Sequence, residues 1–117
     1  MYDDMESTAA ALRALSNPRR MTIVRWLADP TAHFPPQRDG DLVEDGVCVG
    51  FITKKIELSQ PAVTEHMQVL ASAKLVTSKK IKNWVFYKLE TRRVATLLED
   101  LSKALLGSDA IDPEKVQ

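Results

Sequence analysis

The chain has 117 residues, 44% of them hydrophobic and 27% charged, which are the proportions of one ordinary globular domain spanning residues 1–117. No apolar run approaches the roughly 20 residues needed to cross a bilayer, and the acidic N-terminus is unlike a signal peptide, so we expect a cytoplasmic protein without membrane contact. Basic and acidic residues number 16 each, so an anionic partner must be attracted by a local concentration of charge.

Two helices are predicted at the start of the chain. Helical spacing of apolar residues indicates a helix over Met5–Leu15. Asn17 is a favourable N-cap and Pro18 suits the first position of a second helix, which runs to about Ala28. In this helix we expect apolar side chains to face the core and arginines to stay in solvent: Met21, Ile23, Val24 and Leu27 inward, and Arg19, Arg20 and Arg25 outward.

Residues 29–46 are predicted to form a long acidic loop. One basic against five acidic residues gives residues 29–45 a net charge of −4, and three prolines and two glycines interrupt any apolar periodicity. A loop of this length is either functional or mobile. A cation site is an alternative, but a hydrated loop is favoured because the candidate ligands, His33, Asp39, Asp41, Glu44 and Asp45, lack regular spacing.

Two short helices joined by a tight turn follow the loop. The first is predicted over Phe51–Leu58, and Ser59-Gln60-Pro61 then gives a hydroxyl cap with proline in the first turn of the next. This second helix ends near Ala73. Its buried face is expected at Val63, Met67 and Leu70, which leaves a polar outer face of Gln60, Thr64, Glu65, Gln68 and Ser72.

A β-hairpin and a final helix complete the chain. β-branched and aromatic residues indicate strands over Leu75–Ile81 and Trp84–Leu89, with Lys82-Asn83 at the turn. Alternation places Trp84, Phe86 and Lys88 on one face and Val85, Tyr87 and Leu89 on the other. We expect Trp84 and Tyr87 to be core or interface residues, with walls of an effector pocket as the secondary interpretation.

The last helix is predicted over about Thr91–Leu106, with residues 107–117 as a flexible tail. Its apolar stripe is broader than a small monomer can cover, so we expect the first and last helices to pack against a second copy of the chain. The expected dimer interface consists of Met5, Ala9, Leu12, Leu97, Leu98, Leu101 and Leu105.

Together these elements predict a mainly α-helical fold with a small β-hairpin, the winged helix-turn-helix, and a double-stranded DNA partner. Residues 51–93 carry nine basic against three acidic residues, a net charge of +6 that suits phosphate binding. His66 can equally contact a phosphate or pack under the wing. Expected contacts to bases are Gln60, Ala62, Thr64 and Glu65, and expected contacts to the DNA backbone are Ser59, Lys54, Lys55, His66, Lys79, Lys80, Lys82 and Asn83.

Three motifs in order resemble the ArsR family of winged-helix repressors: Ala14-Leu15-Ser16-Asn17-Pro18-Arg19-Arg20, the stretch from Leu58 to Leu70, and Trp84-Val85-Phe86-Tyr87-Lys88-Leu89. The resemblance implies a homodimer, recognition by the helix that starts at Ser59, and repression relieved by an effector. A dimer in turn predicts an operator that is an inverted repeat.

The chain departs from the family pattern at two kinds of position. Metal-sensing members carry a Cys-Val-Cys pair where this chain has Val47-Cys48-Val49-Gly50, and the histidine and acidic pairs of other sensors are missing from the last helix, so we expect no metal or cofactor. Glu57, Lys74 and Lys82 replace glycines that are usual in the family, which bears on the turn geometry.

Cys48 is interpreted as a small buried hydrophobic residue, because the only thiol has no second cysteine to pair with; a redox sensor is the alternative. The inducer therefore stays open between a redox signal at Cys48, a small molecule and none. The alternative function is a winged-helix protein-interaction module without DNA binding. No carboxylate pair, nucleophile with a base or phosphate-binding glycine loop indicates an enzyme.

Overall fold

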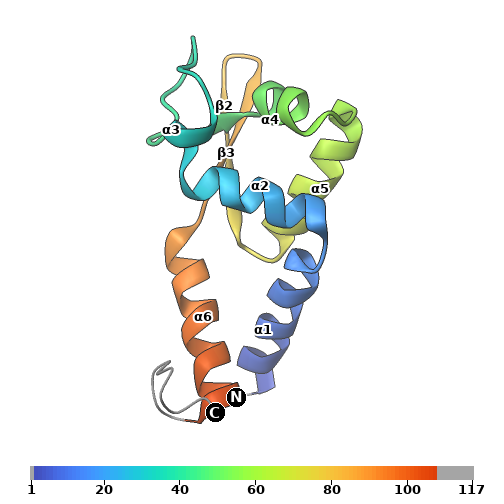
Figure 1. The fold of residues 1–117 in the computed structure, drawn as a ribbon, viewed down its shortest axis with the longest axis vertical. Helices are drawn as coiled ribbons and strands as arrows, with labels where there is room; N and C mark the ends of the chain where they lie inside the picture. The colour runs from blue at the N-terminus through green and yellow to red at the C-terminus, as the bar shows by residue number, and fades with distance from the viewer. Residues whose placement is uncertain (1, 108–117) are drawn as a thin grey trace.

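The computed structural model describes residues 2–107, with side chains from residue 5 onward, so all of the predicted tail except Gly107 lies outside the described residues. Figure 1 shows α2, α4, α5 and the hairpin forming one body, from which α1 and α6 extend in the same direction. The elements in chain order are α1 (Tyr2–Leu15), α2 (Pro18–Ala28), α3 (Pro30–His33), β1 (Val47–Cys48), α4 (Val49–Ile56), α5 (Gln60–Ser72), β2 (Val76–Ile81), β3 (Trp84–Leu89) and α6 (Thr91–Leu106).

Both predicted helix starts are confirmed by their caps. The Asn17 side-chain oxygen accepts hydrogen bonds from the backbone N–H groups of Arg19 and Arg20 at 2.9 and 3.2 Å. The Ser59 hydroxyl accepts one from the Ala62 N–H at 3.3 Å. A proline in the first turn follows each cap, where its missing N–H would have had no partner.

The core lies between α2, α4, α5 and the sheet, as predicted for most positions. Ile23 and Leu27 of α2 are buried, whereas Met21 is 46% exposed, so its predicted place in the core is wrong. Of the two aromatic residues expected in the core or at an interface, Tyr87 is buried and Trp84 is 50% exposed, so Trp84 is not a core residue of the protomer.

The sheet has three strands instead of the two that the sequence predicts. Its order is β1-β3-β2, and both pairs are antiparallel. The hairpin register runs from Val76 opposite Leu89 to Ile81 opposite Trp84. Strand β1 has two residues, too few to show the alternation by which a strand is predicted.

The acidic segment is not the simple loop that we expected. It begins with α3, and it buries Phe34, whose ring contacts Trp26 edge-on at 6.0 Å and stacks on Phe51 at 6.5 Å. Leu42 is buried as well, and the Asp41 carboxylate accepts hydrogen bonds from two backbone N–H groups that follow it. Two isolated apolar anchors and local capping leave no periodic signal in the sequence, which is why the pattern failed there.

Among the described residues, three that are not glycine adopt positive φ, and they stand at the positions where the resemblance leads us to expect glycine. Glu57, Lys74 and Lys82 have φ of 59°, 64° and 56°. Each L-residue in this region costs roughly 1–2 kcal/mol relative to its usual conformation. The turns therefore keep the geometry that glycine would adopt, at a cost in stability.

Helices α1 and α6 leave apolar side chains uncovered where they extend from the body. Met5 and Leu105 are 70% and 76% exposed, and Leu12 and Leu98 are exposed too. Leu97, expected at the dimer interface, instead lies in the protomer's core, because it points from α6 back toward the body. Arg93 ties the two helices together by donating hydrogen bonds to the backbone and side-chain oxygens of Ser7 at 3.0 and 2.8 Å.

Candidate nucleic-acid interface

Helix α5 is held by its apolar face and offers a polar face to solvent. Val63, Met67 and Leu70 are fully buried, which confirms the predicted inner face. On the outer side Gln60, Glu65 and Gln68 are exposed, while Ala62 and Thr64 are half-buried. A shallow open hollow on this side is lined by Gln60, Pro61, Thr64, Glu65 and Gln68, so most of the expected base-contacting residues lie together.

His66 lies against α2, where its ring contacts the side chain of Arg20. Its Nδ1 lies 3.3 Å from the Arg20 Nη1. Burial, and then the positive charge of Arg20, lower the pKa of His66 below its usual 6.5, so the neutral ring accepts a hydrogen bond from Arg20. Arg20, predicted to stay in solvent, also donates to the carbonyl oxygens of Ala14 and Arg13 at the end of α1.

Three lysines of the wing, which is the hairpin formed by β2 and β3, bond to oxygen atoms of the acidic segment. The Lys79 ammonium lies 2.6 Å from an Asp45 carboxylate oxygen, and the Lys82 ammonium lies 3.0 Å from one of Asp39. The hydrogen bond from Lys79 lowers the pKa of Asp45 below its ordinary value. Lys88, at the far end of β3, donates to the Glu44 carbonyl oxygen at 3.2 Å.

Strand geometry explains why Lys80 is not paired with the acidic segment. Lys80 follows Lys79 in β2, so its side chain leaves from the opposite face of the sheet. No ion pair joins Lys80 to another of the described residues, and Lys80 and Asn83 are both exposed. The sequence identified Lys79, Lys80 and Lys82 as one basic group, whereas the structure separates Lys80 from the other two.

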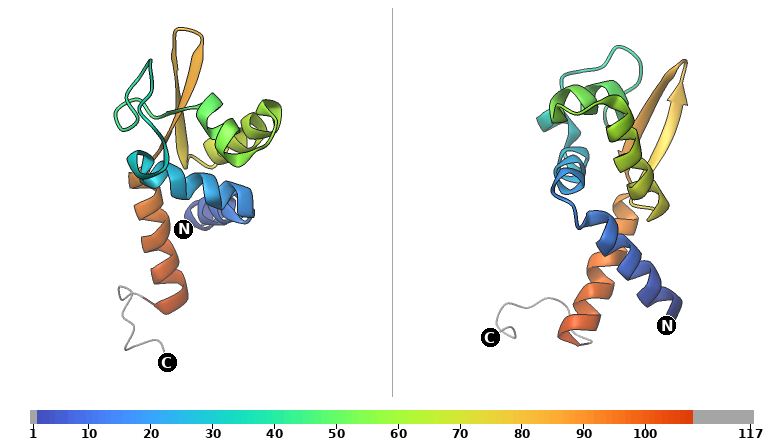
Figure 2. Two further views of the ribbon diagram at one scale, coloured as in Figure 1. Left: turned by 45° about the horizontal axis from the view of Figure 1, so that its top comes forward. Right: turned by 90° about the vertical axis from the view of Figure 1, so that its right-hand side faces the viewer.

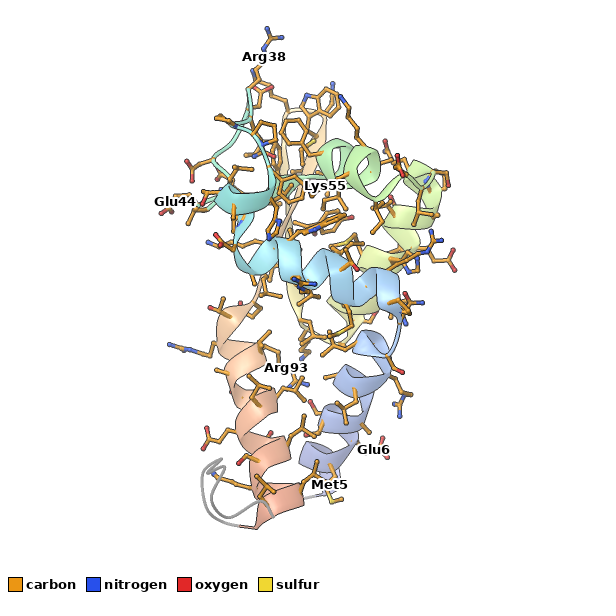
Figure 3. The ribbon with its side chains drawn as sticks, viewed as in Figure 1. Met5, Glu6, Arg38, Glu44, Lys55 and Arg93 are labelled. Carbon is orange, nitrogen blue, oxygen red and sulfur yellow. The ribbon has the colours of Figure 1, made fainter. Side chains whose placement is uncertain are left out.

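The two lysines at the end of α4 also differ. Lys54 is exposed, and no ion pair joins it to another described residue. The Lys55 ammonium lies over the rings of Trp26 and Phe34, 5.1 and 5.8 Å from their centroids, as Figure 3 shows for its position between α4 and α2. Lys55 would therefore have to leave a cation–π contact to reach a phosphate.

Cys48 is half-buried in β1, and its N–H donates to the Gln37 side chain at 2.7 Å. Its side chain borders a hollow of about 330 Å³ with Phe51, Trp84 and Phe86. Within residues 5–107, no three His, Cys, Asp or Glu side chains are grouped so that they could hold a metal ion. None of the helices between residues 2 and 107 is long and apolar enough to cross a membrane.

The sequence did not predict the contacts that Lys88 and Arg20 make with distant parts of the chain. Lys88 shares a strand face with Trp84 and Phe86, so its direction was predictable, but its partner Glu44 is 44 residues away in the chain. The contact between Arg20 and His66 spans 46 residues. Neither long-range contact leaves a local pattern in the sequence.

A capped helix that projects polar side chains, set between a short helix and a basic hairpin, defines a winged helix-turn-helix DNA-binding protein. Known proteins agree with this class. The chain is 33% identical over 89 residues to an uncharacterised HTH-type transcriptional regulator of Bacillus subtilis, a match that covers 76% of this chain and 89% of that one. It is 30% identical over 99 residues to a Halobacterium salinarum protein named for arsenical resistance operon repression, covering 85% and 71% of the two chains.

Among solved structures, HlyU from Vibrio cholerae superimposes with a TM-score of 0.62 at 27% identity, covering 91% of this chain and 99% of that one. No family model matches the sequence. The chain belongs to the ArsR family of HTH-type transcriptional regulators. Its relatives confirm the prediction of a DNA-binding regulator over an enzyme, and they give no support to the alternative of a protein-interaction module.

Proposed function

We propose that the protein is a homodimeric repressor that contacts base edges with α5 and phosphates with the wing. The observation that carries this proposal is the orientation of α5: three fully buried side chains fix its inner face, and its outer face is open to a duplex. A recognition helix in the major groove needs this combination of a rigid base and free polar groups.

The assignment of base contacts follows from side-chain chemistry and position. Gln60 is exposed in the first turn of α5 and can pair with adenine through two hydrogen bonds. Thr64 lies one turn later on the same side, where its hydroxyl and methyl groups suit a base edge. Ala62 and Glu65 flank them and complete the proposed contact set.

The proposed phosphate contacts surround this helix. Ser59 caps α5, and Lys54 lies in the last turn of the preceding helix α4. Lys80 and Asn83 extend from the wing as exposed side chains. The remaining members, which must first change a contact within the protein, are Lys55, His66, Lys79 and Lys82.

The proposed dimer uses the exposed apolar side chains of α1 and α6. Figure 2 shows both helices projecting from the end of the body opposite the hairpin tip, so a second copy can pack there without covering α5. Light scattering should give about twice the chain mass. Replacing two exposed side chains, Leu98→Asp and Leu105→Asp, should give the mass of one chain; an unchanged mass would show that the interface lies elsewhere.

DNA binding is tested by fluorescence anisotropy with duplexes selected from a random pool. We expect an inverted repeat whose half-sites lie roughly one helical turn apart, and an affinity that falls steeply with salt because phosphate contacts release counterions. Binding without salt dependence, or to a single asymmetric site, would contradict the proposed mode of recognition.

Relief of repression by an effector remains part of the proposal. Cys48 is a candidate for a redox signal because its thiol borders a hollow between α4 and the wing. Blocking the thiol should lower DNA affinity in the wild type and leave Cys48→Ser unaffected. Equal affinity before and after blocking would remove Cys48 from the mechanism and leave a small molecule, or no inducer, as the alternatives.

A further inference from the structure

The second part of the acidic segment, residues 37–46, packs on one face of the wing through uncharged contacts. Gly40 has φ of 86°, and a Cβ there would lie 3.0 Å from the Phe86 ring and 3.3 Å from the Ile81 side chain. Gly46, at φ of 104°, leaves no space for a Cβ against the Tyr87 carbonyl oxygen. The Gln37 side chain links the two ends of the segment by donating to the Gly46 carbonyl oxygen at 3.0 Å. These contacts set the segment against the hairpin.

The charges of the segment then meet the charges of the wing. Strand alternation puts Lys79 and Lys88 on the face that also carries Phe86, which is the face the segment covers. Asp45 pairs with Lys79, Asp39 pairs with Lys82, and the Glu44 carbonyl accepts from Lys88. Every lysine of the hairpin except Lys80 is therefore bonded to an oxygen of the segment.

We propose that residues 37–46 are an internal substitute for DNA phosphate, whose carboxylates occupy wing lysines in the free protein and must be exchanged for phosphates when DNA binds. The inference rests on the proposed phosphate contacts of Lys79 and Lys82. A carboxylate and a phosphate offer an ammonium group the same anionic oxygen acceptors, so the two compete for one cation. The segment therefore lowers DNA affinity without touching the base-contacting face of α5.

The magnitude of this competition follows from the exposure of the pairs. The side chains of Lys79 and Lys82 keep 56% and 71% of their surface in solvent. Exposed pairs of this kind correspond to about a 1.4- to fivefold change in binding. Salt screens such pairs, so the competition weakens as ionic strength rises.

The test compares two carboxylate-to-amide substitutions within the segment. Asp39→Asn breaks the pair with Lys82, whereas the control Glu44→Gln removes the same charge from a side chain with no ion pair to another of the described residues. Figure 3 shows Glu44 pointing away from the hairpin. By anisotropy on the selected duplex, Asp39→Asn should bind about 1.4- to fivefold more tightly than wild type, and Glu44→Gln should gain less than half as much.

A double-mutant cycle then tests whether the gain acts through the wing lysine. In a Lys82→Gln background, Asp39→Asn should gain no more than Glu44→Gln gains in the wild type. A larger gain there, an equal gain in Glu44→Gln and Asp39→Asn on the wild-type background, or no gain in Asp39→Asn would overturn the proposal. These outcomes differ from a failure of the proposed function, in which the wild type itself shows no salt-dependent binding to any duplex.

Discussion

Helix α5 and the wing differ in how the side chains that we propose contact DNA are held in the free protein. The outer face of α5 carries mainly uncharged polar groups whose positions are fixed from behind by Val63, Met67 and Leu70. The wing carries cations, and Lys79 and Lys82 are already paired with carboxylates. Under the proposed function, sequence discrimination is preorganised in α5, while the electrostatic part of the affinity depends on an exchange of partners at the wing lysines.

The largest expected effect comes from removing the preorganised part. Gln60→Ala combined with Thr64→Ala should reduce discrimination between the selected duplex and a scrambled one by about 100-fold, since each good base contact contributes about 1–3 kcal/mol. Affinity for the scrambled duplex should stay near that of the wild type. Anisotropy on both duplexes measures this ratio, and a uniform loss on both would show that the two residues do not contact bases.

The second prediction concerns differences within the wing. Lys80→Ala should weaken binding to every duplex about 1.4- to fivefold more than Lys79→Ala does, because Lys79 must first leave Asp45. Both variants should reduce the slope of log affinity against log salt. An equal loss in the two variants would mean that the acidic segment does not distinguish these lysines.

Each of the two regions has a turn with one non-glycine residue at positive φ, and these two residues give the third prediction. Glu57→Gly before α5 and Lys82→Gly at the wing tip should each stabilise the fold by about 1 kcal/mol, because glycine tolerates positive φ. In thermal unfolding this corresponds to about 3–6 °C. Only Lys82→Gly should also weaken DNA binding.

The control for this prediction keeps the strain and removes the side chain. Glu57→Ala retains a Cβ at φ of 59° and should not raise the melting temperature. A similar rise in Glu57→Ala and Glu57→Gly would attribute the stabilisation to the lost charge instead of the backbone.

The smallest expected effect is the pH dependence of the contact behind α5. The pKa of His66 is lowered in the fold, so between its ordinary value of 6.5 and the lower folded value the unfolded chain binds more protons. Stability should therefore fall as the pH is lowered through this window. His66→Gln should show a smaller fall between pH 7 and 5.5 by thermal unfolding, and an identical fall in both proteins would contradict the lowered pKa.

The helices other than α3, the two caps and the hairpin could be predicted because each leaves a local signal, such as Asn17 before Pro18 and Ser59 before Pro61. The acidic segment could not be predicted. Its place in the fold depends on Phe34 and Leu42 as isolated apolar anchors, and on pairs such as Asp39 with Lys82 that are far apart in the chain. Charge counts separated the segment from the wing, whereas in space the two are in contact.

The most direct test of the account is to map where α5 lies on a duplex. An iron chelate that cleaves DNA would be attached to Gln68→Cys on the outer face of α5 and, as a reference, to Lys103→Cys on α6, each in a Cys48→Ser background. We predict cleavage from position 68 within each half-site of the selected duplex, and little from position 103. Equal cleavage from both positions, or none from position 68, would show that α5 does not face DNA.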